Sequence, residues 1–447
     1  MKRIKKMSPM KIILMGYCLV ILVGTLLLML PASAKGQGGV SMIDAFFTAT
    51  SATCVTGLVR FDTYMNWTIF GQIVILVMIQ IGGIGFMTFV VSVISLTRMK
   101  IGFSQRLVMQ ESVAAPQIGG IVRNTRIMLI GTLVVEGMGA LLLAFHFCPR
   151  LGLGKGLYFS VFHSISAFCN AGFDLMGNSG EAFSSLTTLG TNAYVNLIIM
   201  FLIISGGLGF FVWYDLLEKR FSFRKMELHS KMVIVVTLIL VVGGAAGIFI
   251  FEQFGSAFDG YTTSEKILLS FFQSVTARTA GFNSANLGNL MGSSQFLMIC
   301  LMMIGGSAGS TAGGIKTTTF AVMVMSISAK LRREKSIECF GRRLDDEILR
   351  TSSCIFMIYM FASIASAMVI STVENVPVFT ALFETVSAIG TVGCTLGITP
   401  GVGTLSEIIL SMLMIFGRVG PITFLFAFSS EKHMMISKMP LGKIRVG

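Results

Sequence analysis

The sequence predicts an all-α membrane protein in which four tandem helix–pore loop–helix repeats surround one pseudo-fourfold pore. Eight transmembrane helices and four re-entrant half-helices make up this fold. Of the 447 residues, 54% are hydrophobic and only 12% are charged, and the mean hydropathy is +0.82. That composition leaves too little charge for the solvated surface of a soluble globule. A loop that ends in glycine also recurs four times at near-equal spacing, as tandem repeats do.

The apolar residues gather in eight long runs, each reaching the ~20 residues that a helix needs to cross about 30 Å of hydrocarbon. The runs cover residues 12–30, 68–97, 126–147, 194–214, 230–251, 295–328, 351–372 and 406–428. An alternative for the first run is a signal peptide, because its start is basic and Ala32-Ser33-Ala34 resembles a leader-peptidase site. The run is longer than the ~7–15 apolar residues of a signal peptide, and it completes the first repeat, so we favour a membrane span.

Basic residues predict the orientation. Most of the 34 Lys and Arg lie in the N-terminal tail, in the loops 98–126, 219–231 and 330–350, and in the C-terminal tail. The positive-inside rule then places both termini in the cytoplasm, in a multi-pass protein of the cell (plasma) membrane. The net charge of +13 is explained by topology and predicts no nucleic-acid partner.

The repeats divide the chain at 1–98, 99–220, 221–335 and 336–447, and the third contains a broken second helix. Each repeat holds a shorter Ser/Thr-rich apolar segment, too short to span, which predicts a re-entrant half-helix. These segments cover residues 41–52, 156–168, 264–276 and 377–388. Each runs into a filter loop, and the four loops end in Val55-Thr56-Gly57, Asn170-Ala171-Gly172, Thr279-Ala280-Gly281 and Thr391-Val392-Gly393.

The filter loops suit a dehydrated cation, which must exchange its water for fixed oxygen ligands such as backbone carbonyls aimed at an axis. Glycine permits the left-handed backbone angles that turn consecutive carbonyls inward. The fourth loop begins like the potassium-channel pattern T-V-G-Y-G, whereas the other three keep only its glycine. We therefore expect K⁺ at the filter carbonyls, with Asn170 contributing its carbonyl before its side chain.

A polar, glycine-rich run lies in the middle of the second span of the third repeat. Unwound backbone at that depth is tolerated only inside protein or beside water, so we expect this gate loop to close the pore below the filter. Its residues are Gly305, Gly306, Ser307, Ala308, Gly309, Ser310, Thr311, Ala312, Gly313 and Gly314. Arg418 in the last helix is expected to form hydrogen bonds to the carbonyls of this gate loop, and a structural ion pair is the alternative. Lys316 is expected either to lie at the gate or to extend its ammonium group to the cytoplasmic surface.

Other polar residues of the spans predict structural roles. Arg278 is expected to bind a partner behind the filter, with Glu384 as a candidate, and Glu136 and His163 are expected to pack or form hydrogen bonds. The glycines at Gly309 to Gly314 match G-x-x-x-x-G but lack the following G-K-[ST] and a preceding strand, so the chain should bind no nucleotide or other cofactor itself. The spans hold no paired carboxylates, histidine cluster or nucleophile and base set, and we expect no enzyme.

Two motifs carry a family resemblance. The strings A-R-T-A-G-F-N at Ala277 to Asn283 and G-G-S-A-G-S-T-A-G-G-I-K-T-T-T at Gly305 to Thr319, within a fourfold repeat, resemble the Trk/Ktr/HKT superfamily of cation transporters. The resemblance covers essentially the whole chain and is closest to the membrane subunit (KtrB) of bacterial Ktr potassium uptake systems. It implies a homodimer with one pore per subunit, a cytoplasmic RCK-type nucleotide-binding ring (KtrA-like) and K⁺ uptake stimulated by Na⁺. It also implies that glycine at all four filter positions goes with K⁺ preference, whereas serine in the first goes with Na⁺ transport.

Two transport mechanisms fit these features. Four pore loops around one axis favour passive, gated cation conduction under the control of the cytoplasmic partner. The alternative is an ion-coupled secondary transporter with alternating access, which typically has several broken helices and charged sites near the midplane. Only one clearly unwound helix and no carboxylate cluster are expected here, so the sequence favours conduction.

Overall fold

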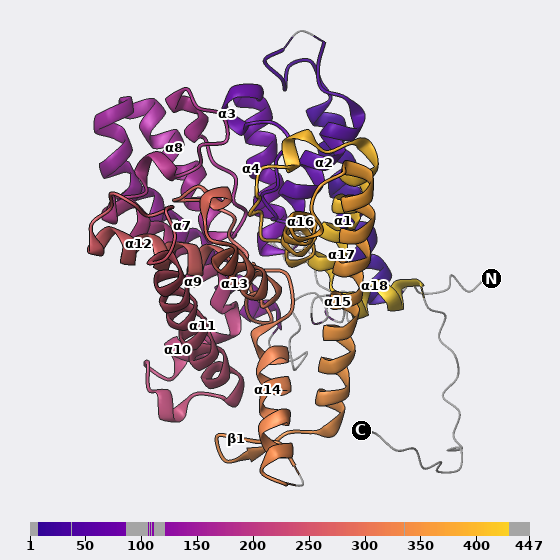
Figure 1. The fold of residues 1–447 in the computed structure, drawn as a ribbon. Helices are drawn as coiled ribbons and strands as arrows, with labels where there is room; N and C mark the ends of the chain where they lie inside the picture. The colour runs from indigo at the N-terminus through magenta and orange to yellow at the C-terminus, as the bar shows by residue number, and fades with distance from the viewer. Residues whose placement is uncertain are drawn as a thin grey trace, which may run out of the picture.

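The computed structural model describes residues 8–36, 38–85, 121–334 and 336–428, together with positions 106, 108 and 110 (Figure 1). The longer helices are α1 (Pro9–Leu28), α2 (Met42–Thr53), α4 (Ile69–Ile84), α7 (Ile121–Leu151), α8 (Leu153–Phe168), α9 (Ala193–Leu208), α10 (Phe210–Glu218), α11 (Leu228–Glu252), α12 (Thr263–Thr276), α13 (Gly292–Met303), α14 (Thr317–Leu331), α15 (Asp346–Glu374), α16 (Val378–Gly390), α17 (Thr404–Val419) and α18 (Pro421–Phe428). The short helix α3 (Thr63–Asn66) precedes α4, and an antiparallel hairpin of β1 (Glu338–Cys339) and β2 (Arg342–Arg343) joins α14 to α15. The end of the second predicted run, most of the basic N-terminal tail and loop 98–126, and the basic C-terminal tail lie outside the described residues.

Four described helices are long and apolar enough to cross a membrane: α1, residues Thr125–Leu151 of α7, α11 and α15. They are the first helices of the four predicted repeats. Large apolar side chains such as Leu133 and Phe361 are 64% and 71% exposed on their outer faces, which suits contact with lipid. The first of these helices packs against α2 and α4, and the backbone of Ser33, in the suspected cleavage motif, accepts a hydrogen bond from Thr68 N at 2.9 Å. The first run is therefore part of the first repeat.

The four half-helices α2, α8, α12 and α16 occupy the predicted segments to within a few residues. Each packs against the long helix that precedes it in the chain. Local sequence sets where they begin. Ser41 accepts a hydrogen bond from Asp44 N at the start of α2, and Thr262 and Glu265 form a reciprocal capping box at the start of α12, which satisfies backbone N–H groups that have no partner within the helix.

Glycines interrupt the second helices of the repeats. In the second repeat α9 and α10 meet at 92°, and in the fourth α17 and α18 meet at 101°. The connecting residues Gly209 and Gly420, and Gly85 at the end of α4, have φ of 90°, 91° and 90°. Only glycine adopts this backbone region readily. Both bends lie at single glycines, and among the described second helices only that of the third repeat has the expected long unwound run. In the third repeat the break is longest, from Ile304 to Lys316.

Glycines three residues before Gly85, Gly209 and Gly420 allow close packing of the second helices in the first, second and fourth repeats. A Cβ on Gly82, Gly206 or Gly417 would overlap a carbonyl oxygen at the end of the neighbouring half-helix. These oxygens belong to Thr53, Phe168 and Ile389, each four residues before a filter glycine. In these three repeats, small residues thus let the second helix pack directly against the base of the filter loop.

Arg60 joins the first repeat to the fourth. Its Nε lies 2.7 Å from Asp44 Oδ1, and its guanidinium also pairs with the buried Glu407. The same side chain donates to the carbonyl of Val402 at 2.9 Å. A bonded charge cluster therefore connects the first and last repeats.

Candidate functional site

The four filter loops share one backbone conformation. The filter glycines Gly57, Gly172, Gly281 and Gly393 have φ of 91°, 69°, 79° and 91°. The residue two positions earlier also has positive φ in every loop, and these residues are Val55 (58°), Asn170 (59°), Thr279 (70°) and Thr391 (51°). Left-handed angles cost a non-glycine residue roughly 1–2 kcal/mol. They persist only where the surrounding structure imposes them, which is typical of ligand-binding sites.

Hydrogen bonds to the half-helices hold the loops in this conformation. Thr56 N, Ala171 N and Val392 N each donate to the carbonyl of a serine at 2.8 Å. The serines are Ser51, Ser166 and Ser387. The hydroxyls of the first and third also accept from the filter glycines Gly57 and Gly393 at 3.1 Å.

Different hydrogen bonds hold the third loop. Ala280 N donates to the carbonyl of Thr276 at 2.9 Å, and the Thr276 hydroxyl donates to Phe282 O at 2.6 Å. Sequence reasoning did not single out these hydroxyl residues. The Ser/Thr-rich composition of the half-helices was the signal for them.

The filter glycines form a closed ring of neighbours. A Cβ on Gly57 would lie 2.5 Å from Ala171 O, one on Gly172 would lie 2.8 Å from Ala280 O, and one on Gly281 would lie 2.5 Å from Val392 O. A Cβ on Gly393 would overlap Thr56 O of the first loop, so the contact between the fourth and first loops closes the ring. Each loop thus faces the carbonyl that precedes the glycine of the next. The four carbonyls surround one axis, and no side chain larger than hydrogen fits between adjacent loops.

The gate loop is tied at its base and to the second repeat. Gly305 N donates to Ile315 O at 2.8 Å, and Thr317 N donates to Gly306 O at 3.0 Å, so the loop leaves and re-enters the helix at one place. Three further backbone bonds reach the junction of α9 and α10. They are Ser307 N to Gly207 O (3.0 Å), Thr311 N to Gly206 O (3.3 Å) and Phe210 N to Gly309 O (3.0 Å).

Arg418 bonds the gate loop to two further repeats. Its guanidinium donates to the carbonyls of Thr311, Gly82 and, at 3.2 Å, Gly83. The bond to Thr311 reaches a carbonyl of the unwound run, as the sequence suggested, whereas Gly82 and Gly83 lie in the last turn of α4. No carboxylate is among the partners of Arg418 in the described residues. Lys316 Nζ donates to Ala312 O at 2.8 Å, so the lysine points into the protein and does not snorkel to the surface.

A cavity of about 300 Å³ lies at the level of the gate loop. All four repeats contribute to its wall, among them Gly85, Phe210, Ala308 and Arg418. Two cationic side chains, Arg418 and Lys316, line it, and no carboxylate does so among the described residues. The described wall of this cavity therefore carries cationic side chains without a balancing carboxylate, which disfavours a cation there by charge repulsion.

The proposed Arg278–Glu384 pair does not form. Arg278 donates to Thr237 Oγ1 and Gly305 O, both at 3.4 Å. Glu384 instead accepts from the hydroxyls of Thr395 and Thr399 at 2.6 and 2.7 Å and from Leu396 N at 3.0 Å. The segment that follows its own filter loop supplies these hydrogen bonds to the Glu384 carboxylate, so Arg278 is not among the partners of Glu384.

Glu136 and His163 form hydrogen bonds within the protein. Gln80 Nε2 lies 3.1 and 3.0 Å from the two carboxyl oxygens of Glu136. The ring nitrogens of His163 lie 2.8 Å from Phe159 O and 3.3 Å from Leu175 N. Both side chains are buried and serve packing and hydrogen bonding, as expected.

Comparisons with known proteins agree with this architecture. A family model described as "TrkH: Cation transport protein" matches residues 4–438. The chain is 38% identical to the Ktr system potassium uptake protein B of Bacillus subtilis, over 99% of this chain and 97% of the relative. It is 37% identical to the potassium/sodium uptake protein NtpJ of Enterococcus hirae, over 95% and 94%. The crystal structure of the potassium transporter TrkH from Vibrio parahaemolyticus superimposes with a TM-score of 0.74 at 16% identity, covering 96% of this chain and 86% of that one.

The structural similarity confirms the predicted fold class. The family contains transport proteins, in agreement with the prediction that the chain is not an enzyme. By sequence, over nearly its whole length, this chain belongs to the TrkH family of cation transport proteins.

Proposed function

We propose that the chain is the potassium-translocating pore subunit of a K⁺ uptake system in the cell membrane. The ring of Thr56, Ala171, Ala280 and Val392 carbonyls carries the proposal, because it supplies fixed oxygen ligands without adding net charge. Buried hydroxyls in and beside the loops, those of Thr53, Thr56 and Thr391, have no hydrogen-bond partner among the described residues. They are additional oxygen ligands for a partly hydrated ion.

The names of the relatives support K⁺ as the ion, since two are potassium uptake proteins of Ktr systems and one is a potassium/sodium uptake protein. K⁺ at the filter carbonyls moves down its electrochemical gradient, and the gate loop with Arg418 and Lys316 blocks that movement below the filter. Both termini lie in the cytoplasm. A homodimer, a cytoplasmic RCK-type nucleotide-binding ring and stimulation by Na⁺ complete the proposal.

A coupled secondary transporter is the second candidate. The bends of 92° and 101° in the second and fourth repeats favour it, because discontinuous helices are common in alternating-access transporters. The ring of loops favours conduction, since it offers a continuous set of carbonyls around one axis.

Purified protein in liposomes separates the two candidates. With a K⁺ gradient and no other ion gradient, conduction predicts K⁺ flux that follows the membrane potential and reverses at the K⁺ equilibrium potential. A coupled transporter predicts a reversal potential that moves with the gradient of the second ion. Adding the cytoplasmic partner with nucleotide should raise flux without moving the reversal potential.

The α14–α15 connection is expected to bind the cytoplasmic partner. Arg332, Arg333, Arg342 and Arg343 are all exposed on it. Replacing all four with Glu should weaken co-purification of the partner on the order of tenfold, because exposed ion pairs contribute about 0.2–1 kcal/mol each. Arg150→Glu with Lys266→Glu, in segments predicted on the opposite side, is the control. Unchanged affinity in the fourfold variant would limit these arginines to setting topology.

A further inference from the structure

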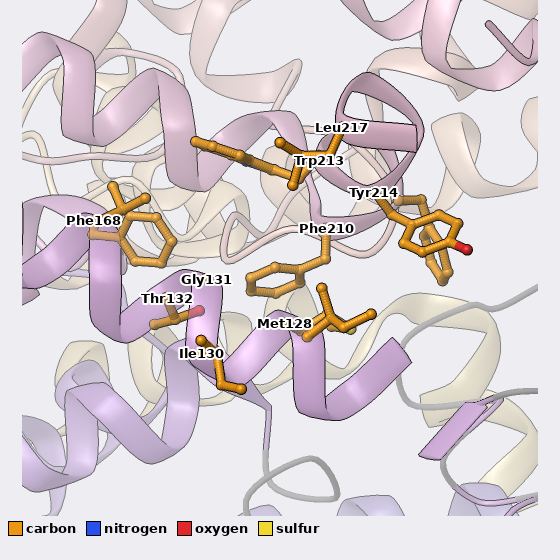
Figure 2. Close-up of a pocket in the computed structure, with 12 residues that line it drawn as sticks. Met128, Ile130, Gly131, Thr132, Phe168, Phe210, Trp213, Tyr214 and Leu217 are labelled. Carbon is orange, nitrogen blue, oxygen red and sulfur yellow. The ribbon is translucent and has the colours of Figure 1, made fainter. Parts of the chain in front are cut away.

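An apolar cavity of about 260 Å³ lies between α7 and α10 (Figure 2). Met128, Ile130 and Thr132 line it from α7, and Trp213 and Leu217 line it from α10. Figure 2 shows these side chains converging on one space from two sides. The cavity has an exposed rim, where Ile130 and Leu217 are 57% and 60% exposed. Within the part of the chain that the structure describes this rim is open, and its α7 side lies on the stretch of that helix that is long and apolar enough to cross a membrane.

The inner wall of this cavity is shared with the conduction pathway. Phe210 lines both the apolar cavity and the cavity below the filter, and its backbone N holds Gly309 of the gate loop. Phe168, also in the wall, is the last residue of half-helix α8. The carbonyl of Phe168 accepts from the Thr311 hydroxyl of the gate loop at 3.2 Å. Whatever fills the apolar cavity therefore touches two residues that position the gate loop.

Basic residues flank one end of the cavity. Arg126 directly precedes the lining residue Ile127, and Lys219 and Arg220 follow Leu217 by two and three positions. Arg126 and Arg220 are exposed. Of the described carboxylates on α10, Glu218 is paired with Lys219 at 3.5 Å, and Asp215 is buried and accepts a hydrogen bond from Glu227 N at 2.8 Å. The opposite end, at Phe168 and Val135, is apolar. An apolar slot with a basic mouth complements a hydrocarbon chain attached to an anionic head group.

We propose that one acyl chain of an anionic phospholipid occupies this cavity, with its phosphate at Arg126, Lys219 and Arg220. The chain packs against Phe210 and supports the closed gate loop through the Phe210 N to Gly309 O bond. Its effect on flux rests on the proposed function, but binding of the lipid does not.

The test uses phosphatidylglycerol with a photoreactive group on its acyl chain, in vesicles that contain the full-length protein. Gly131 lines the cavity, and a Cβ there meets no atom within 4 Å, so Gly131→Phe fills the space without displacing the backbone. Gly137 on the same helix is equally open but is absent from the lining. Gly137→Phe is the matched control.

Labelling of residues 127–135 and 210–217 is expected in the parent and in the control, and it should fall by roughly tenfold in Gly131→Phe. An equivalent phosphatidylcholine probe should label these peptides less, and replacing the three basic residues with Gln should abolish that preference. Equal labelling of parent and Gly131→Phe, or equal labelling by both lipids, would overturn the proposal. So would a cross-link showing that residues 86–120 of the chain fill the cavity. Peptide labelling decides the matter even if the protein carries no K⁺.

Discussion

Removing Gly309 to Ala312 is expected to raise partner-independent K⁺ flux by tenfold or more, the largest effect that the structure predicts. The deletion removes the carbonyl of Thr311, to which Arg418 donates, and the Gly309 carbonyl that Phe210 N holds. The Gly305–Ile315 bond at the base remains. A shift of tenfold in the open population corresponds to about 1.4 kcal/mol, which is less than the roughly 1.5–3 kcal/mol of a single hydrogen bond to a charged group.

Liposome flux without the partner measures this effect. Arg418→Gln should act in the same direction but more mildly, because the loop keeps its backbone bonds to α9 and α10. Arg224→Gln, at an exposed arginine outside the cavity, is the charge-matched control. If the deletion variant inserts and assembles normally and still carries no more K⁺ than the parent, the loop is a packing element and not a gate.

Gly57→Ser is expected to lower the K⁺/Na⁺ permeability ratio by about tenfold. Its side chain would meet Ala171 O at 2.5 Å and the Gly172 backbone at 3.1 Å, on a residue with φ of 91°. One loop must then move outward, which widens the ring and weakens its preference for the ion that fits the original carbonyl positions. Reversal potentials under bi-ionic K⁺ and Na⁺ conditions give the ratio.

Gly180→Ser is the matched control for the backbone. Gly180 has φ of 97°, ends the short helix Met176–Ser179, and a Cβ there would meet no atom within 4 Å. This variant should carry the same strain of roughly 1–3 kcal/mol and leave the permeability ratio unchanged. An unaltered ratio in a folded Gly57→Ser protein would remove the first loop from the selective part of the pathway.

The sequence was sufficient for features encoded in composition and repetition. Half-helices α2, α8, α12 and α16 followed from their length and Ser/Thr content. The four filter loops followed from glycines at matching positions, because a left-handed residue within an apolar repeat has few alternatives to glycine. The Arg418 contact with the gate loop also followed, since a charge at that depth must find carbonyls or a counter-ion.

Features that depend on contacts between residues distant in the chain could not be predicted from the sequence. Glu384 was a reasonable partner for Arg278 by charge alone, but the hydroxyls of Thr395 and Thr399 reach it first. Glycines in a membrane helix can either allow close helix packing or mark a bend, and a single sequence does not separate these two roles. The bends at Gly209 and Gly420 therefore could not be told apart from packing sites. The cavity between α7 and α10 depends on where the 92° bend after α9 places α10, and no local sequence pattern indicates that placement.

The position of the transported ion tests the central claim most directly. Crystals grown in Rb⁺, a K⁺ substitute with an anomalous X-ray signal, should show a peak on the axis enclosed by the carbonyls of Thr56, Ala171, Ala280 and Val392. Excess K⁺ should remove the peak, and the same concentration of Na⁺ should leave it. A ring without Rb⁺, or Rb⁺ held at another site while protein from the same preparation carries K⁺ in liposomes, would contradict the assignment of these four loops as the K⁺ filter.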